Sequence, residues 1–184
     1  LRPRMLVDVS EVTTATAALG TAIELPAMIA PTSLQRVAHP DGEPALARAA
    51  AAAGTIYTLS SLGSVRPREL ADAVGDRSPR WLQLYWSKDR GFTTELVAEA
   101  ADAGFAALVL TIDLPTAGPR ERDFRSGFSL PTDLPMPNLP RALVGDEYFH
   151  ATLGEIVDTS LTWRDLEWLQ AQSSLPLLVK AVLT

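Results

Sequence analysis

The chain has 184 residues, a formal net charge of −6 and 47% hydrophobic residues, a composition typical of a globular protein with an apolar core. Its acidic balance and scattered basic residues indicate neither nucleic-acid binding nor attraction to a membrane surface. Cysteine is absent, which excludes a disulfide scaffold and a thiolate zinc site. We therefore expect a cytoplasmic protein without a metal site. No apolar run approaches the roughly 20 residues of a membrane span.

Five short apolar runs alternate with helical patterns along the chain. Residues 1–27 predict an extended lead-in with a small hairpin around Gly20. The predicted strands are 28–33, 56–61, 81–85, 107–113 and 175–180. The helices predicted between them, from apolar spacing, caps and terminal glycines, are 41–54, 65–75, 93–104 and 159–172. Asp41, a threonine at the start of 93–104, and Thr162 are the expected caps.

The spacing of the strand ends predicts the fold class. Ser33, Ser60, Tyr85 and Asp113 follow one another at intervals of 27, 25 and 28 residues, close to the roughly 30 residues of one unit in a (β/α)₈ TIM barrel. A closed barrel needs eight strands and about 250 residues. We therefore predict an α/β protein with strands 1–5 of such a barrel, a partial barrel. A doubly wound sheet is the alternative, although residues 30–43 lack its usual glycine-rich turn.

The chain divides into four regions of one partial barrel domain, 1–184. The lead-in occupies 1–27, strands 1–4 occupy 28–113, and the last helix with strand 5 occupies 161–184. Between them, residues 114–160 are rich in proline and glycine, which predicts a long loop. A loop of this length is more often functional or disordered than a plain connection.

Polar side chains stand at the predicted strand ends, where barrel enzymes assemble their active sites. Lys180 in an apolar strand can stabilise a developing anion, or it can pack its stem and extend its head to solvent. Asp113 can cap a helix, but no clear helix follows it. Gln83 and Tyr85 alternate on one strand and share a face. They can fill the barrel, but a buried glutamine needs hydrogen-bond partners.

Five segments in order resemble the FMN-dependent L-2-hydroxy acid oxidases and dehydrogenases, the family of glycolate oxidase, lactate oxidase and mandelate dehydrogenase. The segments are "APTSLQRVAHPDGE", "LSS", "QLYWSKDR", "LTIDLPTAGPRERDFRSGF" and "SLTWRDLEWLQAQSSLPLLVKAVLT". The resemblance implies an FMN cofactor, oxidation of a small lactate- or glycolate-like L-2-hydroxy acid to the 2-oxo acid, and a homo-oligomer, often a tetramer.

The resemblance also implies which residues contact the cofactor. Lys180 matches a lysine at flavin N1 that stabilises the reduced ring, and Gln83 matches a residue at the pyrimidine edge. Ser33 stands where relatives usually carry Ala or Gly, with the backbone near flavin N5. The full set of implied cofactor-binding residues is Pro31, Thr32, Ser33, Ser60, Gln83, Thr111 and Lys180.

Four residues are implied to act in catalysis. Besides Lys180, Tyr85 matches a hydroxyl near the substrate, and Asp113 matches the partner of a catalytic histidine, whose proton affinity a carboxylate raises. Arg120 matches an arginine that holds the substrate carboxylate, a task that suits its planar fork.

The resemblance places the catalytic histidine, a second substrate-binding arginine and the phosphate-binding loops after the last predicted strand. We therefore expect this chain not to catalyse the reaction alone. Two alternatives stay open: a non-catalytic or split-barrel fragment that requires a partner chain, and a different FMN or phosphate-ligand barrel such as a relative of isopentenyl diphosphate isomerase.

Overall fold

The computed structural model describes residues 2–75, 79–115, 118, 121–131, 133–140 and 154–182. Its centre is a parallel sheet whose four strands lie in sequence order. The strands are β3 (Tyr57–Leu59), β4 (Arg80–Tyr85), β5 (Ala107–Thr111) and β6 (Leu177–Lys180). Each lies within one of the predicted strands or begins one residue earlier.

The first predicted strand, 28–33, is the exception. Only Ile29 pairs with the sheet, in a single parallel bridge to Tyr57. The Ile29 amide donates to the Ile56 carbonyl, and the Ile29 carbonyl accepts from Thr58. Pro31 shortens the run, because a proline has no amide to donate to a ladder. The five-strand prediction is therefore corrected to four strands and one bridge.

The strand order distinguishes the two predicted fold classes. Each described strand of the sheet pairs in parallel with the next one along the chain, as in a barrel wall. A doubly wound sheet reverses its strand order at a switch point, and the described strands contain no such reversal. The described sheet is not closed, so it is a partial barrel wall.

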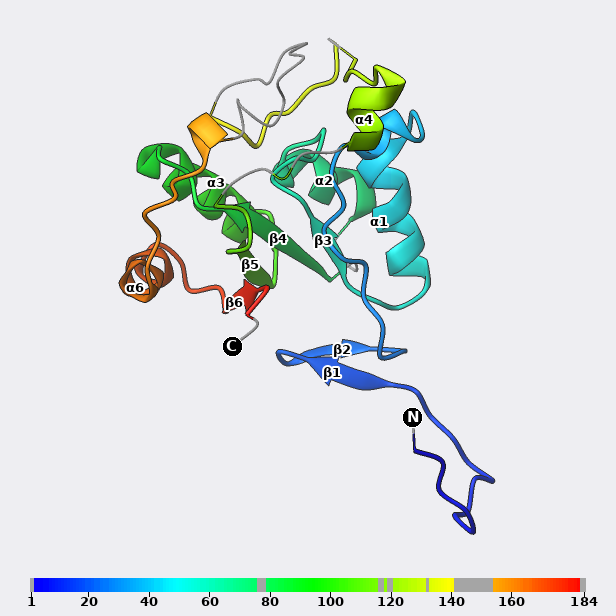
Figure 1. Cartoon of the computed structure of the whole chain (residues 1–184). Coiled ribbons are helices and arrows are strands. Elements are labelled where there is room, and N and C mark those ends of the chain that lie inside the picture. The colour runs from blue at the N-terminus through cyan, green and yellow to red at the C-terminus, as the bar shows by residue number, and fades with distance from the viewer. Residues whose placement is uncertain are drawn as a thin grey trace.

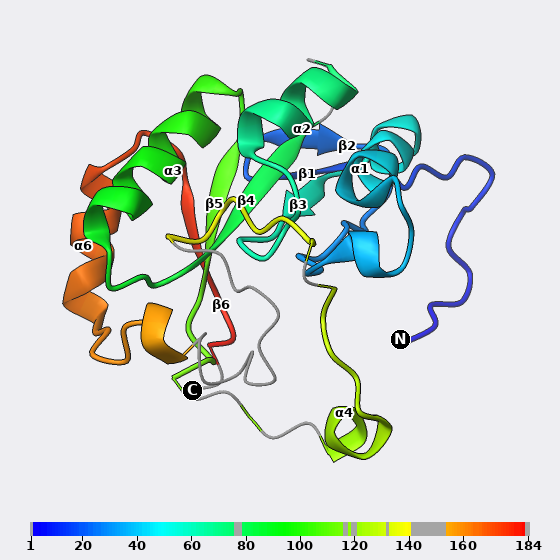
Figure 2. The same ribbon diagram turned by 90° about the horizontal axis from the view of Figure 1, so that it is seen from above.

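Helices cover one face of the sheet (Figures 1 and 2). They are α1 (Gly42–Ala52), α2 (Pro67–Val74), α3 (Arg90–Asp102) and α6 (Trp163–Ala171). Leu82 and Leu84 of β4, with Leu108 and Leu110 of β5, are almost fully buried beneath them. Burial of these side chains is the main stabilising contribution of the sheet–helix layer.

The predicted helix ends are mostly confirmed. Gly54 and Gly104 have φ values of 63° and 72°, a region that glycine enters at no steric cost. The predicted cap of 93–104 is wrong, because α3 begins at Arg90 and Asp89 accepts from the Phe92 amide at 2.9 Å. The hydroxyl of Thr93 instead donates to the Asp89 carbonyl.

The caps expected at Asp41 and Thr162 differ in outcome. Asp41 precedes α1 but its side chain makes no capping hydrogen bond. Thr162 precedes α6, where its amide donates to the Asp165 carboxylate at 2.7 Å. This contact is the reciprocal half of a capping box.

The hairpin predicted around Gly20 is confirmed as β1 (Thr16–Ala18) and β2 (Thr21–Ile23). Its two turn residues, Leu19 and Gly20, have φ values of 48° and 78°, as two-residue hairpin turns require. Ile23 is buried with Ile56, Trp81 and Ala107 at the beginning of the sheet strands. The hairpin therefore covers that end of the sheet (Figure 1).

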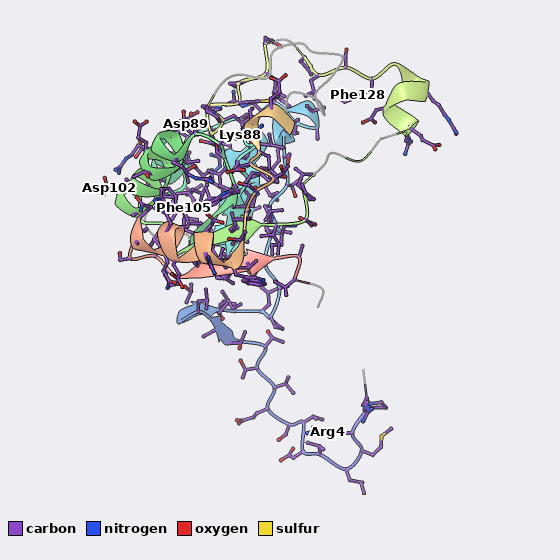
Figure 3. All side chains as sticks on the ribbon, turned by 60° about the vertical axis from the view of Figure 1, so that its left-hand side comes forward. Arg4, Lys88, Asp89, Asp102, Phe105 and Phe128 are labelled. Carbon is purple, nitrogen blue, oxygen red and sulfur yellow. The ribbon has the colours of Figure 1, made fainter. Side chains whose placement is uncertain are left out.

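The described parts of the predicted loop 114–160 contain a helix and buried residues. They include α4 (Glu121–Ser126) and a buried stretch in which Met136 and Leu139 pack with Leu62. The Asn138 side chain donates to the Val65 carbonyl at 2.7 Å. This part of the loop is therefore fixed against the sheet domain, whereas Figure 3 shows Phe128 beside α4 at a distance from the sheet.

Candidate functional site

The register of the sheet brings three of the predicted site residues together at the carboxyl ends of the strands. Tyr85 lies opposite Thr111, and Thr111 lies opposite Lys180. Carboxyl ends of parallel strands meet at one edge, so side chains from separate parts of the sequence become neighbours there. Gln83 and Tyr85 lie on the face of β4 that the helices do not cover, because Leu82 and Leu84 occupy the other face.

A line of hydrogen bonds crosses the strand ends and is centred on Gln83. The Gln83 side-chain oxygen accepts from the Ser60 hydroxyl at 3.0 Å, and its side-chain nitrogen donates to Thr111 Oγ1 at 3.0 Å. Ser33 Oγ lies 3.5 Å from Ser60 Oγ and extends the line by one residue. Gln83 is only 1% exposed, so these partners meet the requirement of a buried amide.

Ser61 belongs to the same line, although it is not among the site residues predicted from the sequence. Its amide donates to the Gln83 side-chain oxygen at 3.1 Å, and its hydroxyl donates to the Gln83 carbonyl at 2.7 Å. Its position beside Ser60 at a strand end was the available signal. The side-chain oxygen of Gln83 therefore accepts two hydrogen bonds from one loop, which fixes the plane of the amide.

Lys180 and Asp113 form an ion pair at the same edge. Lys180 Nζ lies 3.5 Å from Asp113 Oδ1, and the side chains are 41% and 49% exposed. The Ile112 amide donates to the Lys180 carbonyl at 3.3 Å, which keeps the two strand ends together. A pair this exposed contributes little to stability, but it holds an ammonium beside a carboxylate next to the Gln83 line.

Tyr85 lies where the strand ends meet the segment that follows β5. It is half-buried and packs against an apolar cluster of buried residues. The buried members of that cluster are Leu62, Met136, Leu139, Ile156 and Val157. The tyrosine therefore has an apolar neighbourhood on one side and the polar strand ends on the other.

The remaining predicted residues differ in how they are placed. Thr32 is exposed, and its hydroxyl donates to the Ala30 carbonyl at 3.3 Å, while Pro31 is half-buried beside it. Arg120, predicted to hold the substrate carboxylate, lies outside the described residues. No group of His, Cys, Asp or Glu within the described ranges has the arrangement of a metal site.

A cavity of about 220 Å³ lies beside the candidate site, between the ends of β5 and β6 and the start of α6. Apolar side chains such as Trp86, Leu161 and Val179 form much of its wall. Among the described site residues, Thr111 alone lines this cavity. The other predicted cofactor-binding residues lie outside it.

The donors at the strand ends suit the edge of a flavin ring. That edge presents carbonyl oxygens and ring nitrogens, which accept from an amide, a hydroxyl or an ammonium. Gln83 Nε2 retains a second hydrogen beyond the one it gives Thr111, and Lys180 supplies a positive charge. The residues present therefore fit the ring of FMN.

Comparison with known proteins gives the family. The family model for FMN-dependent dehydrogenases matches residues 1–184. The chain is 45% identical to glycolate oxidase 3 of Arabidopsis thaliana over 189 residues, covering 100% of this chain and 51% of that protein. It is 46% identical to L-lactate oxidase of Nostoc sp. over 193 residues, covering 100% of this chain and 53% of that protein.

Solved structures agree with this result. The structure of mandelate oxidase with (S)-4-hydroxymandelic acid matches with a TM-score of 0.88 and 38% identity, covering 100% of this chain and 52% of that one. The chain thus spans about half the length of the relatives that it matches. It belongs to the FMN-dependent dehydrogenase family, whose cofactor is FMN.

Proposed function

We propose that the protein carrying this chain oxidises a small L-2-hydroxy acid, similar to lactate or glycolate, to the 2-oxo acid. Glycolate oxidase, L-lactate oxidase and mandelate oxidase among the relatives support this reaction and favour it over an isomerase. The observation that carries the proposal is the Gln83 hydrogen-bond line next to the Lys180–Asp113 pair, at one edge of a parallel sheet.

The strand-end residues would hold and orient the cofactor. When bound there, FMN would supply the acceptor for the two electrons that leave the hydroxy acid. Gln83, fixed by Ser60 and Thr111, presents its amide to the polar edge of the ring. Lys180 keeps a positive charge where negative charge develops on reduction, and a preorganised charge of this kind lowers the barrier.

Three other residues would act on the substrate side. Tyr85 directs its hydroxyl toward the reacting hydroxy acid, and Arg120 binds the substrate carboxylate through its planar fork. Asp113 accepts a hydrogen bond from the base, a histidine outside this chain. A carboxylate there would fix the tautomer of the imidazole and raise its pKa.

The test replaces Lys180 by Met in the flavin-loaded protein. We expect turnover of L-lactate or glycolate to fall about 100-fold, the size typical for removing one preorganised electrostatic group. Lys88→Met is the matched control, because Lys88 is the chain's other lysine and its ammonium contacts the Gly154 carbonyl at 3.3 Å. Steady-state rates of the two variants equal to wild type would contradict the role given to Lys180.

A split-barrel fragment is the second candidate. All four residues of β6 are half-buried, and no described strand pairs with the outer edge of β6. An intact mass near 19.8 kDa without flavin absorption, together with a tightly bound partner chain, would favour it. A larger polypeptide with bound flavin that hydroxy acids reduce would favour the oxidase.

A further inference from the structure

Glu43 is a fully buried carboxylate outside the predicted site. It lies in the first turn of α1, is 0% exposed, and forms no ion pair within the described residues. Its carboxylate accepts from the Gln35 amide at 3.3 Å, from the Ser64 amide at 2.9 Å and from the Ser64 hydroxyl. A buried carboxyl group needs hydrogen-bond partners in place of water, and these three contacts supply them.

The donors belong to two different loops. Gln35 follows the bridged residue Ile29, and Ser64 follows β3. The first loop carries Ser33 and the second carries Ser60, whose hydroxyl oxygens lie 3.5 Å apart at the head of the Gln83 line. Glu43 therefore joins the two loops that deliver the first two hydroxyls of the candidate site.

The first of these loops has a backbone conformation that requires support. Leu34 has φ 55° and ψ 45°, the left-handed region that residues with a Cβ seldom adopt. The Leu34 amide donates to the Leu62 carbonyl at 2.9 Å, and the next amide, that of Gln35, donates to Glu43. These neighbouring contacts hold the turn in place, and one of them depends on Glu43.

The Gln35 side chain supports the same turn from its other side. Its Nε2 donates to the Tyr57 hydroxyl at 2.9 Å and to the Thr32 carbonyl at 3.3 Å. The Ser33 turn is thus attached to β3 through Tyr57 and to the loop after β3 through Glu43. One attachment ends in β3 and the other in the loop after β3, which carries Ser60.

We propose that Glu43 is a positioning residue for the flavin site, because it sets the spacing between the Ser33 and Ser60 loops and so the placement of the Gln83 line. The inference rests on the proposed function, since it assigns the residue that supports that site. Glu43 itself touches neither Ser33 nor Ser60 in any described contact.

The test is Glu43→Gln, which preserves size but exchanges the charged acceptor of the Gln35 and Ser64 amides for a neutral, weaker one and places an NH₂ group against the Ser64 hydroxyl. Amide hydrogen exchange of the full chain is the first measurement, and we expect Gln35 and Ser64 to exchange at least tenfold faster. FMN affinity and the visible absorption spectrum of the flavin-loaded protein are the second. We expect the dissociation constant to rise at least tenfold, with a shifted flavin band.

Two further variants separate positioning from general stability. Leu70→Ala removes a fully buried side chain of α2 and should lower the unfolding midpoint while leaving FMN affinity within twofold. Ser64→Ala removes the hydroxyl but keeps the amide, so its effect should be smaller than that of Glu43→Gln. A Glu43→Gln protein that is destabilised like Leu70→Ala, but binds FMN as wild type does, would overturn the proposal.

The exchange measurement needs no flavin. It decides whether Glu43 joins the two loops even if the wild-type protein binds no FMN, a result that would instead contradict the proposed function. Unchanged exchange at Gln35 and Ser64 in Glu43→Gln overturns the positioning role directly.

Discussion

At the scale of single residues, Gln83 illustrates what a sequence can and cannot reveal. A glutamine in an apolar strand must find partners when it is buried, so a special environment was predictable. The identity of those partners was not, because Ser60, Ser61 and Thr111 lie 22 to 28 positions away. Only the parallel register brings them together.

This placement predicts the effect of Gln83→Leu. The change leaves the Ser60 hydroxyl and the Ser61 amide buried without their acceptor, and we expect a loss of about 3 kcal/mol in the free energy of unfolding. Urea denaturation measures it. Gln172→Leu is the matched control, because Gln172 is half-buried at the end of α6, and we expect a loss below about 1 kcal/mol. Equal losses in the two variants would contradict the central position of Gln83.

Glu43 shows the opposite outcome at this scale. In the sequence it is an acidic residue in the first turn of a predicted helix, which is typical of ordinary helix stabilisation. Its contacts with Gln35 and Ser64 depend on how two loops fold over α1. No local pattern distinguishes it from an exposed glutamate.

At the scale of elements, the end of the long 114–160 segment is fixed to the sheet domain. Val157 forms an antiparallel bridge with Ser87, and the Asp158 amide donates to the Trp86 carbonyl at 2.7 Å. Arg90 lies 3.9 Å from the centroid of the Trp86 ring and forms an ion pair with Asp158 at 2.6 Å. A cation stacked on an indole and paired with a carboxylate is a strong local anchor.

The anchor predicts a dependence on pH. Hydrogen bonds from the Ser160 hydroxyl and amide, with a smaller contribution from Arg90, lower the pKa of Asp158 below its ordinary value of 3.8. A lowered pKa adds stability above the unfolded value, and that stability is lost as the pH falls through the folded value. We therefore expect part of the stability to disappear below pH 3.8.

Urea midpoints measured across this pH range for wild type and Asp158→Asn test the expectation. The variant should be less stable near neutral pH and should lose less stability on acidification, because asparagine does not titrate. Identical pH profiles for the two proteins would show that another carboxylate is responsible.

At the scale of the whole molecule, the described sheet has a face that helices cover and an edge strand without a described partner. Helices cover one face of the sheet, whereas the outer edge of β6 has no described partner strand. The chain before β1 extends away from the sheet, with Arg4 near its far end (Figure 3). That arm exposes Met5, Leu6, Val9 and Val12, at 70% or more each. Unpaired edges and exposed apolar segments favour association.

We therefore expect the 184-residue chain by itself to associate with increasing concentration, and Val179→Pro to weaken that association. The carbonyls of Pro176 and Lys180 point toward β5, so the Val179 amide points to the open edge. Proline removes that donor without removing a bond of the β5–β6 ladder. Leu178→Pro is the comparison, since it breaks the ladder itself. Sedimentation velocity that shows a monomer at every concentration in wild type would contradict this expectation.

None of the described helices is long and apolar enough to cross a membrane. This result concerns only the described part of the chain.

The sequence by itself determined most of the elements and their order. Apolar runs of five to seven residues, terminal glycines and alternating strand–helix patterns are local signals, because each depends on periodicity or on one backbone conformation. They predicted four of the sheet strands, the hairpin at Gly20 and the polar strand ends. The start of α3 was missed because Asp89 and Thr93 are both good caps, and only contacts select between them.

The tertiary structure decided which residues meet. The ion pair of Asp113 with Lys180 joins positions 67 residues apart, and the Gln83 line joins β4, β5 and two loops. The single bridge at Ile29 and the burial of Met136 and Leu139 also depend on packing between distant segments. Such contacts are set by sheet register and by competition for buried surface, and neither is written in the local pattern of the chain.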